Sequence, residues 1–126
     1  MVAMNTQINP KTLIDRYVAV WHEPEAARRR AAIESIWSPD GEHLSASKEA
    51  RGYDQLEQRI ADTYQRWVVE ERCSFRALDE PIAHHDAIRF RWEMVSHDGQ
   101  TESIGLDLFI LNDDGSVARV YQFIEQ

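Results

Sequence analysis

Hydrophobic residues recur at helical spacing in three segments of the first half of the chain. From Pro10 they fall three and four residues apart, which predicts a helix ending near His22-Glu23-Pro24: Leu13, Ile14, Tyr17, Val18 and Trp21. A second helix is expected from Pro24, a residue that suits a first turn, through Ala27, Ile33, Ile36 and Trp37. A third helix follows Gly52, with one apolar stripe on Leu56, Ile60, Tyr64 and Trp67.

The rest of the chain shows strand signals. Ser38-Pro39-Asp40-Gly41 is expected to break the second helix, and residues 42–47 to form one short strand. Four longer strands are expected at 73–79, 82–96, 101–112 and 116–125, with turns at His97-Asp98-Gly99-Gln100 and Asp113-Asp114-Gly115. Helices followed by a meander of strands predict the α+β class.

Two of these strands differ in the faces they bury. In 82–96, Ile88, Phe90, Trp92 and Met94 alternate with charged residues, so one face is apolar. In 101–112, apolar residues occupy both faces. A strand that is apolar on both sides indicates a sheet covered twice, once by its own helices and once by another body such as a second subunit.

Asp107 is the only charge in the stretch Ile104 to Leu111. A buried carboxylate costs several kcal/mol unless it is paired, hydrogen-bonded or protonated, so such residues often mark functional sites. The alternative is a structural ion pair with Arg89 or Arg91 on the neighbouring strand. The segment by itself leaves both interpretations open.

Length and charge fit one soluble domain. The chain has 126 residues, enough for a single core; residues 1–9 lack a strong pattern and are expected to be a loose tail before a domain at 10–126. The formal net charge of −8 argues against a nucleic-acid partner, which needs a basic face. The basic run Arg28-Arg29-Arg30 suits a solvated helix face.

Cys73 is the only cysteine, which excludes an intrachain disulfide and disfavours a thiolate metal site. We expect it to be a small buried hydrophobe. The amino-terminal segment does not resemble a signal peptide, and no apolar run approaches the roughly 20 residues that span a bilayer. These features predict a cytoplasmic protein with no membrane partner.

The order of elements and several short motifs resemble the nuclear transport factor 2-like superfamily, which includes ketosteroid isomerases and SnoaL-like polyketide cyclases. The likeness is closest to ketosteroid isomerase in Phe90-Arg91-x-Glu93-Met94-Val95 and in Asp107, eight residues before the turn glycine Gly115. It extends to Arg16-Tyr17-Val18, Trp37-Ser38-Pro39-Asp40 and Arg51-Gly52. The resemblance implies a cystatin-like cone, in which a curved antiparallel sheet wraps around three helices, with a pocket on its concave face and a homodimer through its convex face.

The resemblance also implies roles for individual residues. Tyr17 and Asp107 match the pair that forms the oxyanion hole of ketosteroid isomerase, where a phenol and a protonated acid donate hydrogen bonds to an enolate. The pocket face would then carry Ile88, Phe90, Trp92, Ser103, Gly105, Val120, Gln122 and Ile124. The convex face would carry Ile104, Leu106, Leu108, Tyr121 and Phe123.

The sequence departs from ketosteroid isomerase at the general base. The isomerases place a carboxylate on the short strand after the second helix, and the corresponding position here is near Ser45. Serine alone cannot abstract a proton next to a carbonyl. His43 shares the strand face of Ser45 and is the candidate replacement, although a lone histidine is also common on surfaces.

His84, His85 and Asp86 suggest a metal site, but adjacent strand residues point to opposite faces, so both histidines cannot readily bind one ion. His84 and Asp86 lie on the same strand face as Ile88. They fit either the pocket mouth or the start of a strand that is exposed to water. No triad signature or glycine-rich phosphate loop is found. We therefore predict neither a metal nor a cofactor.

The aromatic residues are candidates for either a pocket or the core. For Trp37 and Trp67 the core is favoured, whereas Tyr17 and Trp92 are assigned to the pocket. Arg59 fits either the cavity mouth or the solvent. The predicted substrate-binding set is Trp21, Arg59, Tyr64, Phe90, Trp92, Ser103 and Gln122.

Three functions remain open. The first is a cofactor-independent acid–base enzyme (an isomerase, cyclase or dehydratase) acting on an apolar carbonyl compound, with Tyr17 and Asp107 polarising its oxygen and His43 as the base. The second is a non-catalytic protein that binds a hydrophobic small molecule. The third is a dimerisation module.

Overall fold

The computed structural model describes residues 9–125, so nearly all of the predicted tail at 1–9 lies outside the described residues. Within this range, three α-helices come first: α2 (Pro10–Val20), α3 (Ala26–Ile36) and α4 (Gly52–Thr63). Asn9 caps α2 by accepting a hydrogen bond from the backbone N–H of Thr12. The axis of α4 continues as a π-helical segment, η1 (Tyr64–Glu70). Helix α3 begins two residues later than predicted, because Pro24 precedes its N-cap, Glu25.

Seven strands form a single mixed sheet: β1 (Trp37–Leu44), β2 (Glu49–Arg51), β3 (Ser74–Ala77), β4 (Ile82–His84), β5 (Ala87–Val95), β6 (Thr101–Leu111) and β7 (Val117–Glu125). Their order is β2-β1-β7-β6-β5-β3, and β4 pairs with β5. Strands β1 and β7 are parallel, whereas the other pairs are antiparallel. The sheet is therefore mixed rather than purely antiparallel.

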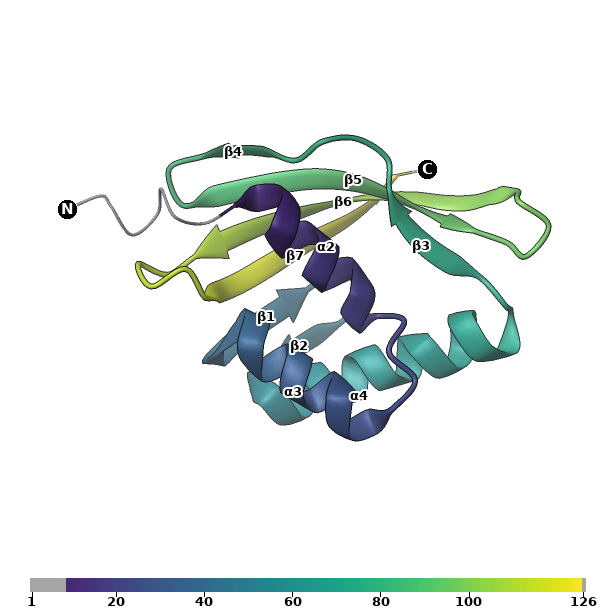
Figure 1. Cartoon of the computed structure of the whole chain (residues 1–126), viewed down its shortest axis with the longest axis horizontal. Helices are drawn as coiled ribbons and strands as arrows, with labels where there is room; N and C mark the ends of the chain where they lie inside the picture. Colours follow the sequence, from purple (N-terminus) through teal and green to yellow (C-terminus); the bar gives the residue numbers. More distant parts are fainter. Residues whose placement is uncertain (1–8, 126) are drawn as a thin grey trace.

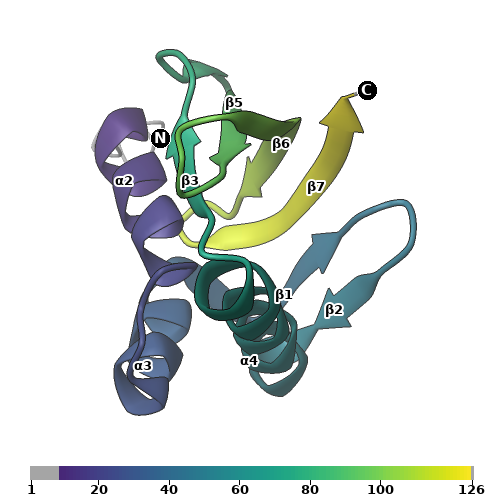
Figure 2. The same ribbon diagram turned by 90° about the vertical axis from the view of Figure 1, so that its right-hand side faces the viewer.

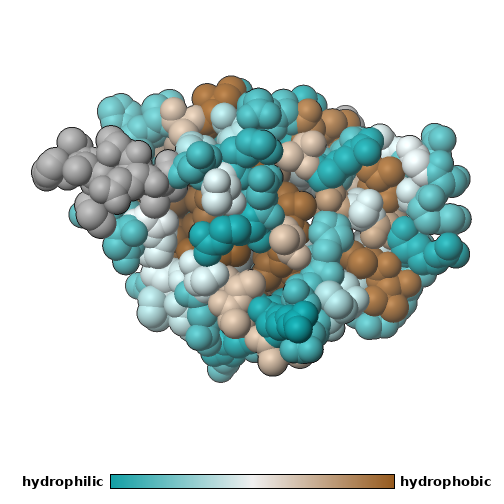
Figure 3. Space-filling model, viewed as in Figure 1, coloured by the Kyte–Doolittle hydropathy of each residue, from teal (hydrophilic) through white to brown (hydrophobic). Residues whose placement is uncertain are grey.

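The helices lie together on one side of this sheet (Figure 1). Seen from the side, the sheet curves around them, and β7 diverges from β1 and β2 toward its carboxyl end (Figure 2). The arrangement is an α+β cone, as predicted. The face drawn in Figure 3 is hydrophilic over most of its area and carries a group of hydrophobic residues near its middle.

Three local predictions are wrong. Helix α3 ends before residues 38–41, as predicted, but strand β1 begins at Trp37 rather than at residue 42 and has a register shift against β7. Residues 49–51 form β2, a strand that was not predicted. The predicted strand 82–96 is two strands joined by a tight turn, in which His85 adopts a positive φ of 51°. These short strands and turns lie too close together in the sequence for periodicity to separate one element from the next.

The core lies between the helices and the inner face of the sheet. It includes Ile14, Ile33, Trp37, Leu56 and Phe109, which are all fully buried or nearly so. Trp37 and Cys73 are core residues, as predicted. Along β6, burial alternates, because Gly105, Asp107, Phe109 and Leu111 are buried whereas Ile104, Leu106, Leu108 and Ile110 are only partly covered.

Candidate functional site

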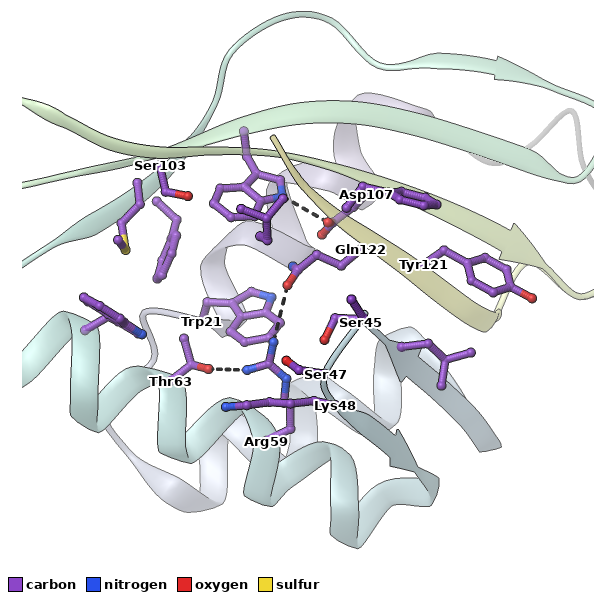
Figure 4. A pocket seen from close by; sticks show the side chains of 18 of the residues that line it. Trp21, Ser45, Ser47, Lys48, Arg59, Thr63, Ser103, Asp107, Tyr121 and Gln122 are labelled. Atoms are coloured by element: carbon purple, nitrogen blue, oxygen red, sulfur yellow. Dashed lines mark hydrogen bonds between the residues drawn. The ribbon is translucent and has the colours of Figure 1, made fainter. Parts of the chain in front are cut away.

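A cavity of about 910 Å³ opens between the inner face of the sheet and helices α2 and α4. This volume lies within the range of pockets that hold drug-sized ligands. Its apolar wall comes from both layers and includes Trp21, Trp67, Phe75, Phe90, Trp92 and Met94. Its polar groups come from α4, from β6 and β7, and from the loop after β1, as Figure 4 shows.

Asp107 projects from the middle of β6 into the wall of this cavity and is 1% exposed. Its Oδ2 accepts a hydrogen bond of 2.6 Å from the hydroxyl of Tyr17, and its Oδ1 accepts one of 3.0 Å from Nε1 of Trp92. Burial raises the pKa of Asp107 to about 6, and hydrogen bonds from Tyr17, Trp92 and Gln122 oppose that rise. The carboxyl group therefore holds substantial populations of both protonation states near neutral pH.

The ion-pair alternative for Asp107 is wrong. Arg89 and Arg91 flank Phe90, the residue that pairs with Asp107, and so lie on the opposite face of the sheet. Arg91 forms ion pairs there with Asp79 and Glu125. Within residues 9–125, Asp107 has no cationic partner at ion-pair distance, and neutral donors carry its hydrogen bonding.

Tyr17 lies on the inward face of α2 and is almost completely buried. Its ring packs edge-on against Phe109, at 4.7 Å between centroids, and against Phe90 at 6.0 Å. Burial, followed by the neighbouring Asp107 charge, raises the pKa of Tyr17 well above its ordinary value. The phenol therefore stays protonated and acts as a hydrogen-bond donor.

His43 lies behind Tyr17 rather than on the cavity wall. Its Nε2 is 3.2 Å from the Tyr17 hydroxyl, and its buried Nδ1 has no partner within the described residues. A buried N–H without a partner costs more than a bare ring nitrogen, so the tautomer with its proton on Nε2 is favoured. The Nε2–H of His43 then donates to the Tyr17 hydroxyl oxygen, and the Tyr17 hydroxyl donates to Asp107.

The same burial makes His43 a weak base. Burial, with a smaller contribution from the Arg59 charge, lowers the pKa of His43 to about 3. A neutral imidazole that does not reach the cavity can orient Tyr17, but it cannot take a proton from a compound bound there. Ser45, the position that aligns with the isomerase base, lies on the cavity lining.

Arg59 extends from α4 toward the cavity, and its guanidinium lies 5.5 Å from the ring centroid of Trp21. It donates to Oγ1 of Thr63 at 2.6 Å and to Oε1 of Gln122 at 3.3 Å, as the dashed lines of Figure 4 show. Burial lowers the pKa of this guanidinium. Arg59 thus belongs to the cavity wall rather than to the solvent.

Six of the seven predicted substrate-binding residues line the cavity: Trp21, Arg59, Phe90, Trp92, Ser103 and Gln122. Tyr64 is outside the lining, and Arg29 stacks on its ring at 4.9 Å. Tyr64 falls on the same helical face as Leu56 and Ile60, which are buried in the core and outside the cavity lining. Trp67 packs against the core, as predicted from the sequence, and also contributes to the lining.

Some face assignments on the sheet also change. Ile88 and Val120 point inward as expected, but they are buried in the core and outside the cavity lining. Tyr121 and Phe123, assigned to the convex face, also contribute to the rim of the cavity. The sequence reasoning missed Lys48, Phe75 and Met94 as lining residues, although the alternation on β5 already placed Met94 with Phe90 and Trp92.

The histidine pair has no place in the cavity. His84, His85 and Asp86 are all exposed where β4 turns into β5, so His84 and Asp86 do not reach the pocket mouth. Among residues 9–125, no group of three or more histidine, cysteine or acidic side chains is arranged to hold a metal ion. In that same range, no helix has the length and apolar character needed to cross a membrane.

Comparison with solved structures identifies the fold. The chain is similar to a candidate isomerase of the SnoaL-like family from Agrobacterium tumefaciens, with 24% identity, a TM-score of 0.83, and coverage of 91% of this chain and 96% of that one. A SnoaL-like protein of unknown function from Burkholderia thailandensis is 15% identical, with a TM-score of 0.70 and coverage of 93% and 95%. A candidate polyketide cyclase from Sinorhizobium meliloti is 12% identical, with a TM-score of 0.68 and coverage of 91% and 99%.

No family model and no curated protein matches the sequence. At these identities, the structural likeness shows the fold alone. The chain therefore has the nuclear transport factor 2-like, SnoaL-like fold that its sequence motifs predicted.

Proposed function

We propose that the cavity binds an apolar carbonyl compound and that Asp107 and Tyr17 carry out cofactor-independent acid–base chemistry on it. The observation that supports this most directly is the desolvated Asp107 carboxyl, which has a pKa of about 6 and a hydrogen bond to the Tyr17 hydroxyl on the wall of a largely apolar cavity. A catalytic acid or base works best when its pKa lies near the operating pH.

The arrangement supports a division of roles between the two residues. The donors from Tyr17 and Trp92 point at Asp107, which favours the ionised carboxylate as the resting form and as the acceptor of a proton from carbon next to the carbonyl. Tyr17 has one hydroxyl proton; as Asp107 takes up the proton from the substrate, that hydroxyl is released from the carboxylate and can donate to the carbonyl oxygen where negative charge develops. Once protonated, Asp107 is itself a donor to that oxygen and can return its proton to the substrate. An isomerisation requires only such proton transfers. In a cyclisation the enolate carbon also attacks a second carbonyl of the substrate, and in a dehydration the enolate expels a hydroxyl group, which leaves as water with the proton from Asp107.

Binding of 2-naphthol, a phenolic enolate mimic, tests the oxygen site. We expect Asp107→Leu and Tyr17→Phe each to weaken its binding about tenfold or more, because each removes a buried hydrogen bond that involves a charged group. Tyr53→Phe is the matched control, because the Tyr53 hydroxyl donates to the backbone oxygen of Trp37 outside the cavity lining. Unchanged affinity in both Asp107→Leu and Tyr17→Phe would refute the oxygen site.

The pH dependence of that binding distinguishes the two roles of Asp107. If the ionised carboxylate accepts from the naphthol, affinity rises as the pH rises through about 6. If the protonated acid is the binding form, as in the oxyanion-hole interpretation, affinity falls over the same range. Fluorescence titration between pH 5 and pH 8 measures the sign directly.

A non-catalytic binding protein is the second candidate, and the position of His43 favours it. His43, the predicted base, is buried behind Tyr17 with its pKa lowered to about 3, which leaves Asp107 to move protons alone. Exchange of the α-protons of 2-tetralone with deuterium distinguishes the candidates. Faster exchange with the natural protein than with Asp107→Leu supports catalysis, whereas exchange at the buffer rate supports binding alone.

We also propose that a second copy of the chain covers the outer face of the sheet. Ile104, Leu106 and Leu108 on β6 are only partly buried there, and Phe123 on β7 pairs with Leu106 while remaining 57% exposed. A contiguous apolar patch on a sheet face is typical of a protein interface. Sedimentation at micromolar concentration is expected to show a homodimer.

A further inference from the structure

The guanidinium of Arg59 is a charged group on the cavity wall whose hydrogen-bond partners are both neutral. It donates to the Thr63 hydroxyl and to the Gln122 amide oxygen. The Nε of Arg59 and the Nε1 of Trp21 are buried and have no partner within residues 9–125. A buried N–H group without an acceptor costs about 1–3 kcal/mol, so a ligand oxygen that accepts from the Arg59 guanidinium would be stabilising.

Arg16 also donates only to neutral oxygens, those of Ser35, but it lies outside the cavity, and other arginines have backbone or carboxylate partners. Arg29 is also buried, but it donates to the backbone oxygens of Glu23 and Pro24 and stacks on Tyr64. More exposed arginines pair with carboxylates, as in Arg30 with Glu57 and Arg91 with Glu125. No ion pair of Arg59 exists among the described residues, although it sits deeper than these.

The surroundings of Arg59 favour a negatively charged group. Ser45, Ser47 and Lys48 from the loop after β1 and Thr63 from α4 converge on the same end of the cavity (Figure 4). Lys48 forms no ion pair within the described part of the chain. Two acids also line the cavity: Asp62, which accepts from the Gln58 amide, and Asp107, which Tyr17 and Trp92 engage.

The remainder of the wall is apolar. Trp92, Phe75, Phe90 and Met94 line the cavity, so one end is cationic and rich in hydroxyls and the other suits a hydrocarbon body. Gln122 connects the two ends, because its amide oxygen accepts from Arg59 while its hydrogen bonding lowers the pKa of Asp107. A ligand held at Arg59 would therefore lie beside the acid–base pair.

We propose that Arg59, assisted by Lys48 and the hydroxyls of Ser45 and Ser47, binds the carboxylate of an otherwise apolar ligand. The planar guanidinium fork matches a carboxylate in geometry as well as in charge. This inference rests on the proposed function and specifies its substrate class, an aromatic or alicyclic keto acid whose carboxylate lies at Arg59 and whose reacting carbonyl lies at Tyr17 and Asp107.

Three probes of one shape test the proposal: 2-naphthol, 6-hydroxy-2-naphthoic acid and 6-hydroxy-2-naphthamide. We expect the natural protein to bind the acid at least about tenfold more tightly than the amide, because a charge-assisted hydrogen bond contributes more than a neutral one. In Arg59→Gln this preference should vanish while the amide binds as before. Arg66→Gln is the matched control, because Arg66 also lines the cavity but pairs with Glu71.

The outcomes separate this proposal from the one on which it rests. Equal affinity of the natural protein for the acid and the amide would overturn the carboxylate site, and so would an equal loss for both probes in Arg59→Gln. Failure of all three probes to bind would instead overturn the proposed function. If Arg59→Gln does not fold, Lys48→Gln with the acid and the amide provides the same comparison, with a smaller expected loss of preference.

Discussion

The two faces of strand β6 carry neighbouring residues into opposite environments. On the inner face, Asp107 is buried next to Phe109, and its partners are the neutral donors Tyr17 and Trp92. On the outer face, Leu106 and Leu108 remain partly exposed. The charged residues beside them, such as Arg91, pair with carboxylates near the solvent.

The two faces differ in how their charged groups are partnered. The outer face pairs its charges near the solvent, whereas the inner face gives Asp107 and Arg59 neutral hydrogen-bond partners. Exposed ion pairs of the outer face contribute about 0–1 kcal/mol each and leave the apolar residues between them available to a partner. On the inner face, Asp107 and Arg59 stay apart, although burial makes an unpaired charge expensive. This cost supports the proposal that Asp107 and Arg59 are positioned for a ligand.

The largest expected effect comes from truncating Phe109 on the inner face. The comparison is with separate truncation of its neighbour Leu108 on the outer face. Phe109 is 0% exposed and packs against Tyr17 and Phe90, so Phe109→Ala should destabilise the protein by about 3–5 kcal/mol. Leu108→Ala should cost the monomer much less, because Leu108 is already partly exposed. Urea unfolding at low concentration measures both, and similar losses would mean that the two faces are equally packed.

Gly105 tests how tightly the inner face is packed around the site. A methyl group at this position would overlap the indole ring of Trp92, which donates to Asp107. We expect Gly105→Ala to cost about 1–3 kcal/mol through overpacking and to change the tryptophan fluorescence. Ile104→Val on the outer face is the control, with an expected change of about 0.5 kcal/mol in thermal unfolding. A fully tolerated Gly105→Ala would contradict the close packing.

The pH dependence of stability tests the buried titratable groups of the inner face. The folded pKa of Asp107 is raised to about 6, so its contribution to stability is present below its unfolded pKa and is lost as the pH rises through about 6. The folded pKa of His43 is lowered to about 3, so its contribution is present above the unfolded value of 6.5 and is lost as the pH falls.

Between pH 7.5 and pH 5 these two contributions oppose each other, each on the order of 1–2 kcal/mol. Relative to the natural protein, His43→Gln should therefore gain stability on acidification, and Asp107→Asn should lose it. Urea unfolding of the three proteins at both pH values provides the measurement. Identical pH slopes would show that neither group titrates as its burial requires.

The smallest effect on monomer stability is expected on the outer face. Leu106→Glu replaces a partly exposed residue opposite Arg91, so the monomer should change by less than about 1 kcal/mol. The same substitution places a charge in the middle of the proposed interface and should dissociate the homodimer in sedimentation experiments. A natural protein that is monomeric at micromolar concentration would show that the outer face has another role.

Periodicity in the sequence predicted most of the fold, because helices and long strands are set by local patterns of three to four and of two residues. It failed where structure depends on distant partners. Strand β1 starts at Trp37 because that residue pairs with Val117, far along the chain, and the turn at His85 interrupts an otherwise continuous strand pattern. Tyr64 likewise lies outside the cavity, because the helical face that it shares with Leu56 and Ile60 packs into the core.

By itself, the sequence determined the order of the elements and the motifs of the nuclear transport factor 2-like fold. It also determined that Asp107, Phe90 and Trp92 lie on the inner faces of their strands. Each of these depends only on spacing along the chain. The tertiary structure alone decided the chemistry of the site. Contacts between helices and sheet place Tyr17 against Asp107, put His43 behind Tyr17 and leave Arg59 with neutral partners. Burial and hydrogen bonding, which set these pKa values and charges, arise only when segments far apart in the sequence are packed together.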